Sequence, residues 1–146
     1  MRFFSFLIVC VSIASIARSQ EIRFNHQTVY VVDMNKSAEF YEKVMGLTRI
    51  EEPFHDNKHI WMKTGAHSQL HIVEGAKSVQ PHDINIHMAF SVDSLQKFID
   101  HLDSMQVKYG DWSQKSKSPQ KRPDGILQIY LQDPDGYWIE VNNDRS

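Results

Sequence analysis

Two halves of this sequence repeat the same order of secondary-structure patterns. Each half begins with a run rich in β-forming residues, reaches capping residues (Asp33 in the first half, Asp93 and Ser94 in the second) and continues into a helix pattern. Three more strand patterns follow each helix. The repeat predicts two βαβββ modules, at about residues 22–75 and 84–143, within one α+β domain over 22–143.

The expected elements of the two modules correspond one to one. The helices run from about Asn35 to Met45 and from about Leu95 to Met105, with apolar residues at helical spacing, and Gly46 fits a helix stop. The strand patterns lie at 24–32, 47–52, 59–63 and 69–74 in the first module and at 85–92, 107–111, 126–131 and 137–142 in the second.

The last strand contains an acidic residue that needs an explanation. The strand is entered through a tight turn, Asp133-Pro134-Asp135-Gly136, and places Glu140 among apolar and aromatic neighbours. A carboxylate in a half-buried strand is costly unless it is paired or binds a metal ion. Three histidines in other strand-like runs are available as partners: His26, His71 and His87.

These four residues occupy equivalent places in the repeat. His26 and His87 lie on the first strand of their modules, and His71 and Glu140 lie on the last. Side chains on one face of adjacent strands can converge, so two curved sheets facing each other would direct all four at one point. A single buried histidine is more often a core residue, but four equivalent positions favour a site for one Zn, Ni, Fe, Mn or Co ion.

Residues 1–19 form a separate segment. A basic start, an apolar run and the small residues Ala17 and Ser19 before Gln20 are typical of a secretory signal peptide, with an uncleaved anchor as the alternative. Cleavage would remove Cys10 and two of the 16 basic residues but none of the 18 acidic ones, which leaves a net charge of −4. We therefore expect a secreted or periplasmic protein without disulfides, nucleic-acid binding or membrane attachment after cleavage.

Four segments carry a resemblance to a known superfamily. They are Asn25-His26 with Tyr30-Val31-Val32-Asp33, Ser37-Ala38-Glu39-Phe40-Tyr41 through Gly46-Leu47, His87-Met88-Ala89-Phe90-Ser91-Val92-Asp93, and Asp133-Pro134-Asp135-Gly136-Tyr137-Trp138-Ile139-Glu140. Together they resemble the vicinal oxygen chelate (VOC) superfamily, which includes glyoxalase I, fosfomycin- and bleomycin-resistance proteins, extradiol dioxygenases and methylmalonyl-CoA epimerase. The resemblance covers about residues 24–143 and is specific for the superfamily rather than for one activity.

The resemblance implies a function and a set of site residues. The metal positions of the superfamily fall on His26, His71, His87 and Glu140. They imply a divalent-metal-dependent enzyme of the lyase or isomerase type, similar to glyoxalase I (lactoylglutathione lyase), whose small substrate chelates the ion through adjacent oxygens. Glu140 is the only carboxylate among the four and is therefore the candidate catalytic base. His71 departs from glyoxalase I, which usually has an acidic or amide residue there.

Two alternative functions remain open at this stage. In an extradiol-dioxygenase-like Fe(II) enzyme, His26, His87 and Glu140 would hold the iron and His71 would be a supporting donor. In a metal-containing resistance protein, the same site would bind and sequester a small molecule such as an antibiotic. Bleomycin-binding members usually lack the ligand set, so the presence of all four residues argues against pure sequestration.

The resemblance also implies an assembly, and the loop pattern leaves two interpretations open. In many single-chain relatives a module of one subunit completes the cavity with a module of the other, which implies a homodimer. The stretch 112–125 is long for a hairpin connection, so it is either an ordinary surface loop or a flap in which Lys121 or Arg122 meets an anionic part of the substrate. Glu74 is expected at the rim of the site, and His59 is expected to face solvent.

Overall fold

The computed structural model describes residues 20–145. The predicted signal peptide and Cys10 lie outside these residues. Within the described range, none of the helices has the length and apolar character needed to cross a membrane.

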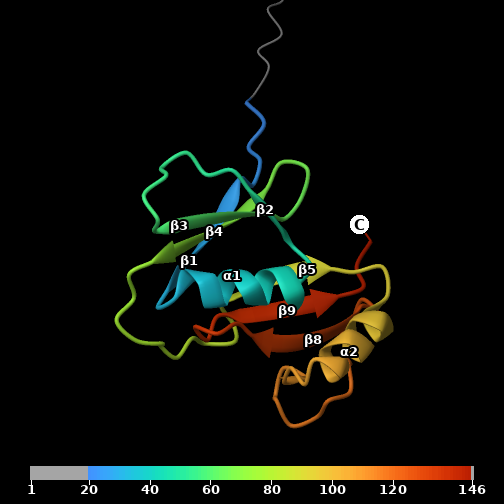
Figure 1. Cartoon of the computed structure of the whole chain (residues 1–146). Helices are drawn as coiled ribbons and strands as arrows, with labels where there is room; N and C mark the ends of the chain where they lie inside the picture. Colours follow the sequence, from blue (N-terminus) through green and yellow to red (C-terminus); the bar gives the residue numbers. More distant parts are fainter. Residues whose placement is uncertain (1–19, 146) are drawn as a thin grey trace, which may run out of the picture.

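The first half of the chain forms one four-stranded sheet covered by one helix (Figure 1). Strands β1 and β4 pair in parallel, and the remaining pairs are antiparallel, in the order β1-β4-β3-β2. The elements are β1 (His26–Val31), α1 (Met34–Lys43), β2 (Thr48–Ile50), β3 (His59–Lys63) and β4 (Gln69–Glu74).

The second half repeats this plan. Strands β5 and β9 pair in parallel, and the sheet order is β5-β9-β8-β6, with β7 paired to β8. The elements are β5 (His87–Ser91), α2 (Leu95–Ser104), β6 (Tyr109–Gly110), β7 (Gln120–Lys121), β8 (Leu127–Gln132) and β9 (Trp138–Asn142). The two βαβββ modules predicted from the repeat are therefore present as two open, curved sheets.

One part of the expected order was wrong. The stretch 112–125 is not a continuous loop, because β7 forms inside it and pairs antiparallel with β8. The hairpin closes where the Arg122 backbone N–H donates to the Ile126 carbonyl (2.8 Å) and Gly125 adopts a φ of +94°. A strand of two residues is too short to produce a recognisable alternation in the sequence. The prolines and lysines of the stretch indicate only a loop.

Alternation along the strands explains the layers. One face of each sheet is apolar and packs beneath its helix, while the opposite face carries the polar and aromatic residues. Asp33 caps α1 by accepting from the N–H groups of Asn35 and Lys36, and Ser94 caps α2 by accepting from Lys97, as their sequence positions predict. The central buried residues are Val29, Val31, Met62, Leu70 and Ile72 in the first module and Ile129, Leu131, Ile139 and Val141 in the second.

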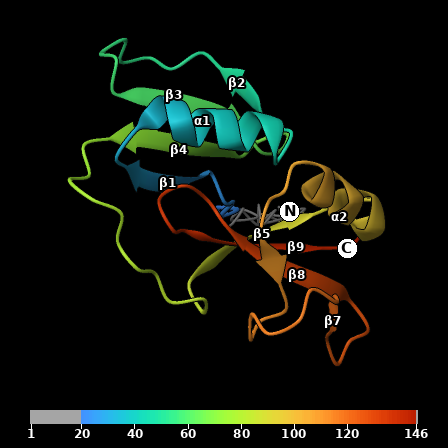
Figure 2. The same cartoon turned by 60° about the horizontal axis from the view of Figure 1, so that its bottom comes forward.

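The turn between β8 and β9 fastens the two modules together. Asp135 accepts a hydrogen bond from the Ser37 hydroxyl (2.7 Å), and Asp133 accepts one from the Tyr41 hydroxyl (2.9 Å), both from α1. Asp133 and Asp135 are 5% and 4% exposed, so these residues are buried acceptors as well as turn formers. Figure 2 shows the result, in which the two sheets lie beside each other without sharing a strand.

Candidate metal centre

His87 and Glu140 come together in the second module. Glu140 on β9 lies opposite Ala89, two residues beyond His87 on the parallel strand β5, so both side chains occupy the same face of the sheet. The His87 Nε2 and Glu140 Oε2 atoms are 3.4 Å apart. The Glu140 side chain is 7% exposed and that of His87 is 25% exposed. This pair is therefore accessible through the imidazole, with the carboxylate beneath it.

Three neighbouring polar side chains hold Glu140 in place. The Tyr130 hydroxyl donates to Oε2 (2.7 Å), and the Asn142 amide donates to Oε1 (2.8 Å). The Gln128 amide donates in turn to the Tyr130 oxygen (2.9 Å). Burial, followed by the hydrogen bond to Glu140, raises the pKa of Tyr130 well above its ordinary value, so the phenol keeps its proton. Glu140 is thus fixed as an oriented acceptor.

The hydrogen bond of His87 determines which of its ring nitrogens faces that acceptor. Its Nδ1 lies 2.7 Å from the Ile84 carbonyl oxygen, which can only accept, so Nδ1 carries the proton. In the neutral imidazole, Nε2 is then an acceptor that faces the Glu140 carboxylate. Two facing acceptors repel unless a proton or a cation lies between them. Metal-binding histidines use the same device, in which the second ring nitrogen donates to a carbonyl.

The other two histidines form a separate pair in the first module. The rings of His26 and His71 are stacked, with centroids 4.2 Å apart and planes 10° from parallel. Trp61 on β3 stacks on the other face of His71, with centroids 3.9 Å apart and planes 3° from parallel. The register explains the contact, because Trp61 lies opposite His71 in the antiparallel pair β3–β4. All three rings therefore lie on the polar and aromatic face of this sheet.

The polar contacts of the two rings differ. His26 Nδ1 lies 2.6 Å from the Asn25 side-chain oxygen, which leaves Nε2 available as a ligand. His71 Nε2 is instead engaged by the Gln69 side-chain oxygen at 2.9 Å. Burial, and then the charges of His26 and His59, lower the pKa of His71, which favours a neutral ring. The His71 imidazole thus has the protonation that a metal ligand needs.

Stacking limits how the two rings can share an ion. The nitrogen lone pair of an imidazole lies in the plane of its ring. Two nearly parallel planes about one ring thickness apart cannot both direct a lone pair at one atom unless a ring turns. As they lie, His26 is the better ligand of the pair, because no hydrogen bond within the described part of the chain engages its Nε2, whereas His71 is held between Trp61 and the Gln69 amide.

The four predicted ligands therefore form two half-sites. His26 and His71 lie together on the first sheet, and His87 and Glu140 lie together on the second. Within residues 20–145, no group of three or more His, Cys, Asp or Glu side chains is arranged to hold a metal ion. One chain brings the candidate ligands together in pairs only.

Two cavities lie near the half-sites. A cleft of about 370 Å³ lies between the modules and is lined by Gln27 and Gln69 from the first and by His87 and Ala89 from the second. A larger cavity of about 580 Å³ involves the segment before β1 and also reaches Gln69, but His87 does not line it, and Glu140 lines neither cavity. The inter-module cleft is therefore the better candidate for a ligand-binding recess.

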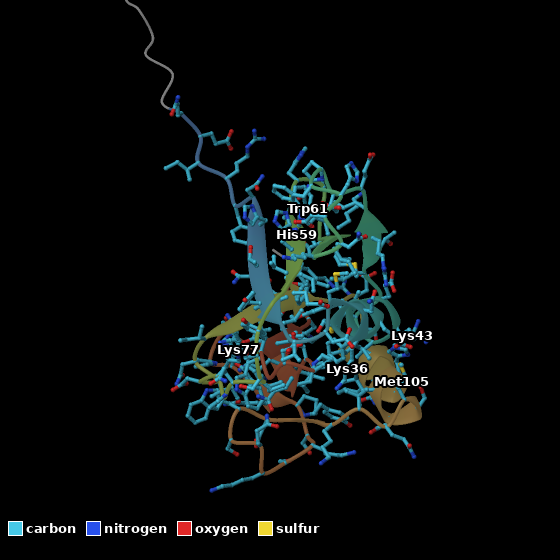
Figure 3. All side chains as sticks on the ribbon, turned by 60° about the vertical axis from the view of Figure 1, so that its left-hand side comes forward. Lys36, Lys43, His59, Trp61, Lys77 and Met105 are labelled. Atoms are coloured by element: carbon cyan, nitrogen blue, oxygen red, sulfur yellow. The ribbon has the colours of Figure 1, made fainter. Side chains whose placement is uncertain are left out.

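Sequence reasoning missed some polar neighbours of the site. Tyr130 and Asn142 were not selected, although Asn142 lies two residues beyond Glu140 and so shares its face. His59, expected to face solvent, is 21% exposed and its Nδ1 lies 2.8 Å from Asp56 Oδ1. Figure 3 shows His59 and Trp61 in the same region of the first sheet. Alternation could have identified Asn142 and His59, whereas Tyr130 depends on the β8–β9 register.

Glu74, expected at the rim, has a structural partner. Its carboxylate accepts from the backbone N–H of Met34 at the start of α1 (3.0 Å). It shares the apolar face with Ile72 rather than the face of His71, as the alternation of the strand requires. Its contacts thus support the helix and not the half-site.

The chain is similar in sequence to known proteins. The sequence model of the Glyoxalase/Bleomycin resistance protein/Dioxygenase superfamily matches residues 23–141. The uncharacterized protein YwbC of Bacillus subtilis is 27% identical over 124 residues, which cover 81% of this chain and 94% of YwbC.

Two solved structures show the same fold with different named activities. The fosfomycin resistance protein FosX of Listeria monocytogenes has a TM-score of 0.66 and 22% identity, over 86% of this chain and 96% of that one. Lactoylglutathione lyase of Agrobacterium tumefaciens has a TM-score of 0.63 and 17% identity, over 85% and 95%. At these identities the likeness shows the fold and not the reaction. The chain belongs to the Glyoxalase/Bleomycin resistance protein/Dioxygenase superfamily, the VOC superfamily of the sequence resemblance.

Proposed function

We propose that this protein is a divalent-metal-dependent enzyme of the lyase or isomerase type that acts on a small substrate through adjacent oxygens. The pair His87 and Glu140 supports the proposal most strongly. A buried carboxylate, oriented by Tyr130 and Asn142, lies 3.4 Å from the Nε2 atom of His87. A cation satisfies both groups. His26 supplies a third ligand, and His71 lies beside it.

We propose that a second copy of the chain completes the site. Each chain holds the two half-sites on separate sheets, and proteins of this superfamily are often dimers. In a homodimer, the His26 half-site of one copy would face the His87 and Glu140 half-site of the other. Each dimer would then hold two equivalent centres.

The residues around the proposed metal position have different roles. A bound divalent ion acts as a Lewis acid on substrate oxygens. Tyr130 and Asn142 keep Glu140 oriented toward that position, and His87 is oriented by the Ile84 carbonyl. Glu140 remains the candidate proton acceptor, but it must release the Tyr130 hydrogen bond to move. This constraint supports a ligand role for Glu140 more directly than a role as a mobile base.

A second function has a specific observation in its favour. Because His71 is stacked on His26 and engaged by Gln69, the set that remains free is two histidines and one carboxylate. That set is typical of Fe(II) oxygenases with open coordination positions. Dioxygen consumption with a catechol would support this alternative over isomerisation.

Metal content and turnover test the proposal together. The purified protein, residues 20–146, is loaded separately with Zn²⁺, Ni²⁺, Mn²⁺ or Fe²⁺, and each form is assayed with a hemithioacetal, an epoxide and a catechol. We expect about one ion per complete site and turnover of one substrate class, both lost in Glu140→Ala. His55→Asn is a matched control, because the His55 side chain is 69% exposed and its ion-pair neighbour is Glu52, outside both half-sites. Absence of metal in native and reconstituted protein would refute the proposal, and unchanged ligand recovered from a metal-loaded protein would indicate sequestration.

Subunit mixing tests the shared site. His26→Ala and Glu140→Ala homodimers each lack an intact centre. If the centre is built across two copies, the mixed dimer regains one intact centre, so refolding the two variants together restores metal binding to part of the population. If each centre lies within one chain, mixing restores nothing. A wild-type monomer by light scattering at micromolar concentration that still binds metal fully would also refute the arrangement.

We also propose that the protein acts outside the cytoplasm, because residues 1–19 have the pattern of a cleaved signal peptide. Glutathione is scarce in many such compartments, which disfavours a glutathione adduct as substrate. N-terminal sequencing of the protein recovered from a secreting host should begin at Gln20. A cytoplasmic protein that retains residue 1 would contradict this location.

A further inference from the structure

Arg122 is a cation placed beside the carboxylate of the candidate metal centre. Its Nη1 lies 3.8 Å from Glu140 Oε1, and its Nη2 donates to Asp124 Oδ2 (2.5 Å). The arginine side chain is 35% exposed, whereas that of Glu140 is 7% exposed. The guanidinium therefore lies between the buried carboxylate of Glu140 and the solvent.

The hairpin decides which of two adjacent cations faces the centre. Lys121 lies opposite Leu127 and Gln120 lies opposite Gln128 in the pair β7–β8. Gln128 belongs to the face that carries Tyr130 and Glu140. Alternation therefore puts Arg122 on the face of the centre and Lys121 on the opposite one. The turn after Arg122 is closed by the Gly125 N–H, which donates to the Arg122 carbonyl (2.9 Å).

The charges around Arg122 change when a metal ion is present. Without an ion, three carboxylates act on the guanidinium: Asp124 and Glu140, which are its ion-pair neighbours, and Asp144. A divalent cation bound to Glu140 takes over that carboxylate and adds two positive charges a few ångströms from Arg122. The surroundings of Arg122 are then two charge units more positive than in the metal-free protein. This change favours an anion, which a guanidinium can bind with two parallel hydrogen bonds.

We propose that Arg122 competes with the metal ion for Glu140 in the metal-free protein and binds an anionic group of the substrate in the metal-loaded protein. This inference rests on the proposed function, because it needs a metal at Glu140. It assigns the substrate to the carboxylates, phosphates or phosphonates whose anionic group lies next to the chelating oxygens. It also predicts an order of binding, with the metal ion first and the anion second.

Two affinities measured on four proteins test this assignment. Zinc affinity is measured by competition with a chromophoric chelator, and methylphosphonate affinity is measured by calorimetry on the zinc-loaded protein. Wild type is compared with Arg122→Ala, Arg122→Lys and the matched control Lys121→Ala, which removes a neighbouring charge from the opposite face. Thermal melting shows that each variant is folded.

Opposite changes in the two affinities are expected for Arg122→Ala. Zinc should bind about 2- to 5-fold more tightly, because a partly exposed competitor of the metal is lost. Methylphosphonate should bind about 10-fold more weakly or worse, because a charged hydrogen-bond donor is lost. Arg122→Lys should keep part of the anion affinity, and Lys121→Ala should leave both values within about 2-fold of wild type.

The outcomes separate this inference from the proposed function. Normal zinc binding with unchanged anion affinity in Arg122→Ala would overturn the role of Arg122 and leave the metal centre intact. An equal effect of Lys121→Ala would overturn it too, because a diffuse positive field would then explain the binding. Absence of zinc binding in wild type would overturn both proposals.

Discussion

The two half-sites share one topology but are stabilised in different ways. In the second module, hydrogen bonds from Tyr130 and Asn142 hold a buried carboxylate. In the first module, the ring of Trp61 stacks on His71, which stacks on His26. One half is charged, buried and held by directional bonds, and the other is aromatic and more exposed.

This difference suggests separate roles for the halves. A preorganised carboxylate gives most of the affinity for a cation, because its position and charge are set before binding. The stacked rings of Trp61, His71 and His26 form a flat aromatic surface, and His26 is the last ring of the stack. We therefore expect the second module to dominate metal binding and the first to complete the site. The predictions below test this asymmetry, beginning with the largest expected effect.

The largest effect should come from exchanging a ligand in each half. Glu140→Gln removes the charge but keeps the shape, and it should weaken zinc binding by more than about 100-fold, beyond the usual effect of changing a supporting residue. His71→Gln should weaken it by less than about 10-fold, because His71 is already engaged by Gln69. Competition with a chelator measures both. Equal losses would mean that the two halves contribute equally.

The support of each half can be removed separately. Tyr130→Phe deletes the hydroxyl that donates to Glu140 and should weaken zinc binding by about 10- to 100-fold. Trp61→Phe is the counterpart in the first module. Its indole N–H is buried and has no hydrogen-bond partner among residues 20–145, so the change should alter zinc affinity by less than about 2-fold. A larger effect for Trp61→Phe would show that ring stacking, and not hydrogen bonding, determines metal affinity.

The contact between the modules should affect stability instead of metal binding. Tyr41→Phe removes the donor to the buried Asp133 and should lower the free energy of unfolding by about 1–3 kcal/mol. Urea denaturation of the metal-free protein measures this loss. Zinc affinity should stay unchanged, and a parallel fall in affinity would show that the half-sites depend on module docking.

The same variant has an expected pH dependence. Burial raises the pKa of Asp133 above its unfolded value, so its contribution to stability is greatest when it is protonated and falls as the pH rises through the folded pKa. The hydrogen bond from Tyr41 lowers the pKa of Asp133 and so opposes the effect of burial, because it stabilises the ionised carboxylate. Removing it should therefore cost more stability at pH 7 than near pH 4. Identical losses at both pH values would contradict this assignment.

The smallest effect should come from a similar bond at the surface of the second module. The Tyr109 hydroxyl donates to Asp103 (3.2 Å), whose side chain is 50% exposed. Tyr109→Phe should lower the free energy of unfolding by less than about 1 kcal/mol, because water replaces the lost donor. Urea denaturation of Tyr109→Phe and Tyr41→Phe under the same conditions compares the two losses in the free energy of unfolding. A loss as large as that of Tyr41→Phe would show that burial of the acceptor is not what matters.

Periodicity and caps determined much of this protein from the sequence. The repeat identified both modules, alternation identified most strands, and Asp33 and Ser94 marked the helix starts. Equivalent positions in the repeat identified His26 and His71, and His87 and Glu140, which the parallel strand pairs bring into two half-sites. All these features depend on residues near one another in the chain or on its internal repeat.

Only the tertiary structure decided how those residues are held and which neighbours they meet. The contact of Tyr130 with Glu140 depends on the β8–β9 register, and the choice of Arg122 over Lys121 depends on the two-residue strand β7. The burial of Asp133 depends on the docking of a helix 92 residues away in the sequence. A local pattern specifies which face a side chain occupies, but contacts between distant segments are fixed by the packing of the two sheets. The sequence thus determined the candidate ligands, and packing determined their arrangement as two unequal halves.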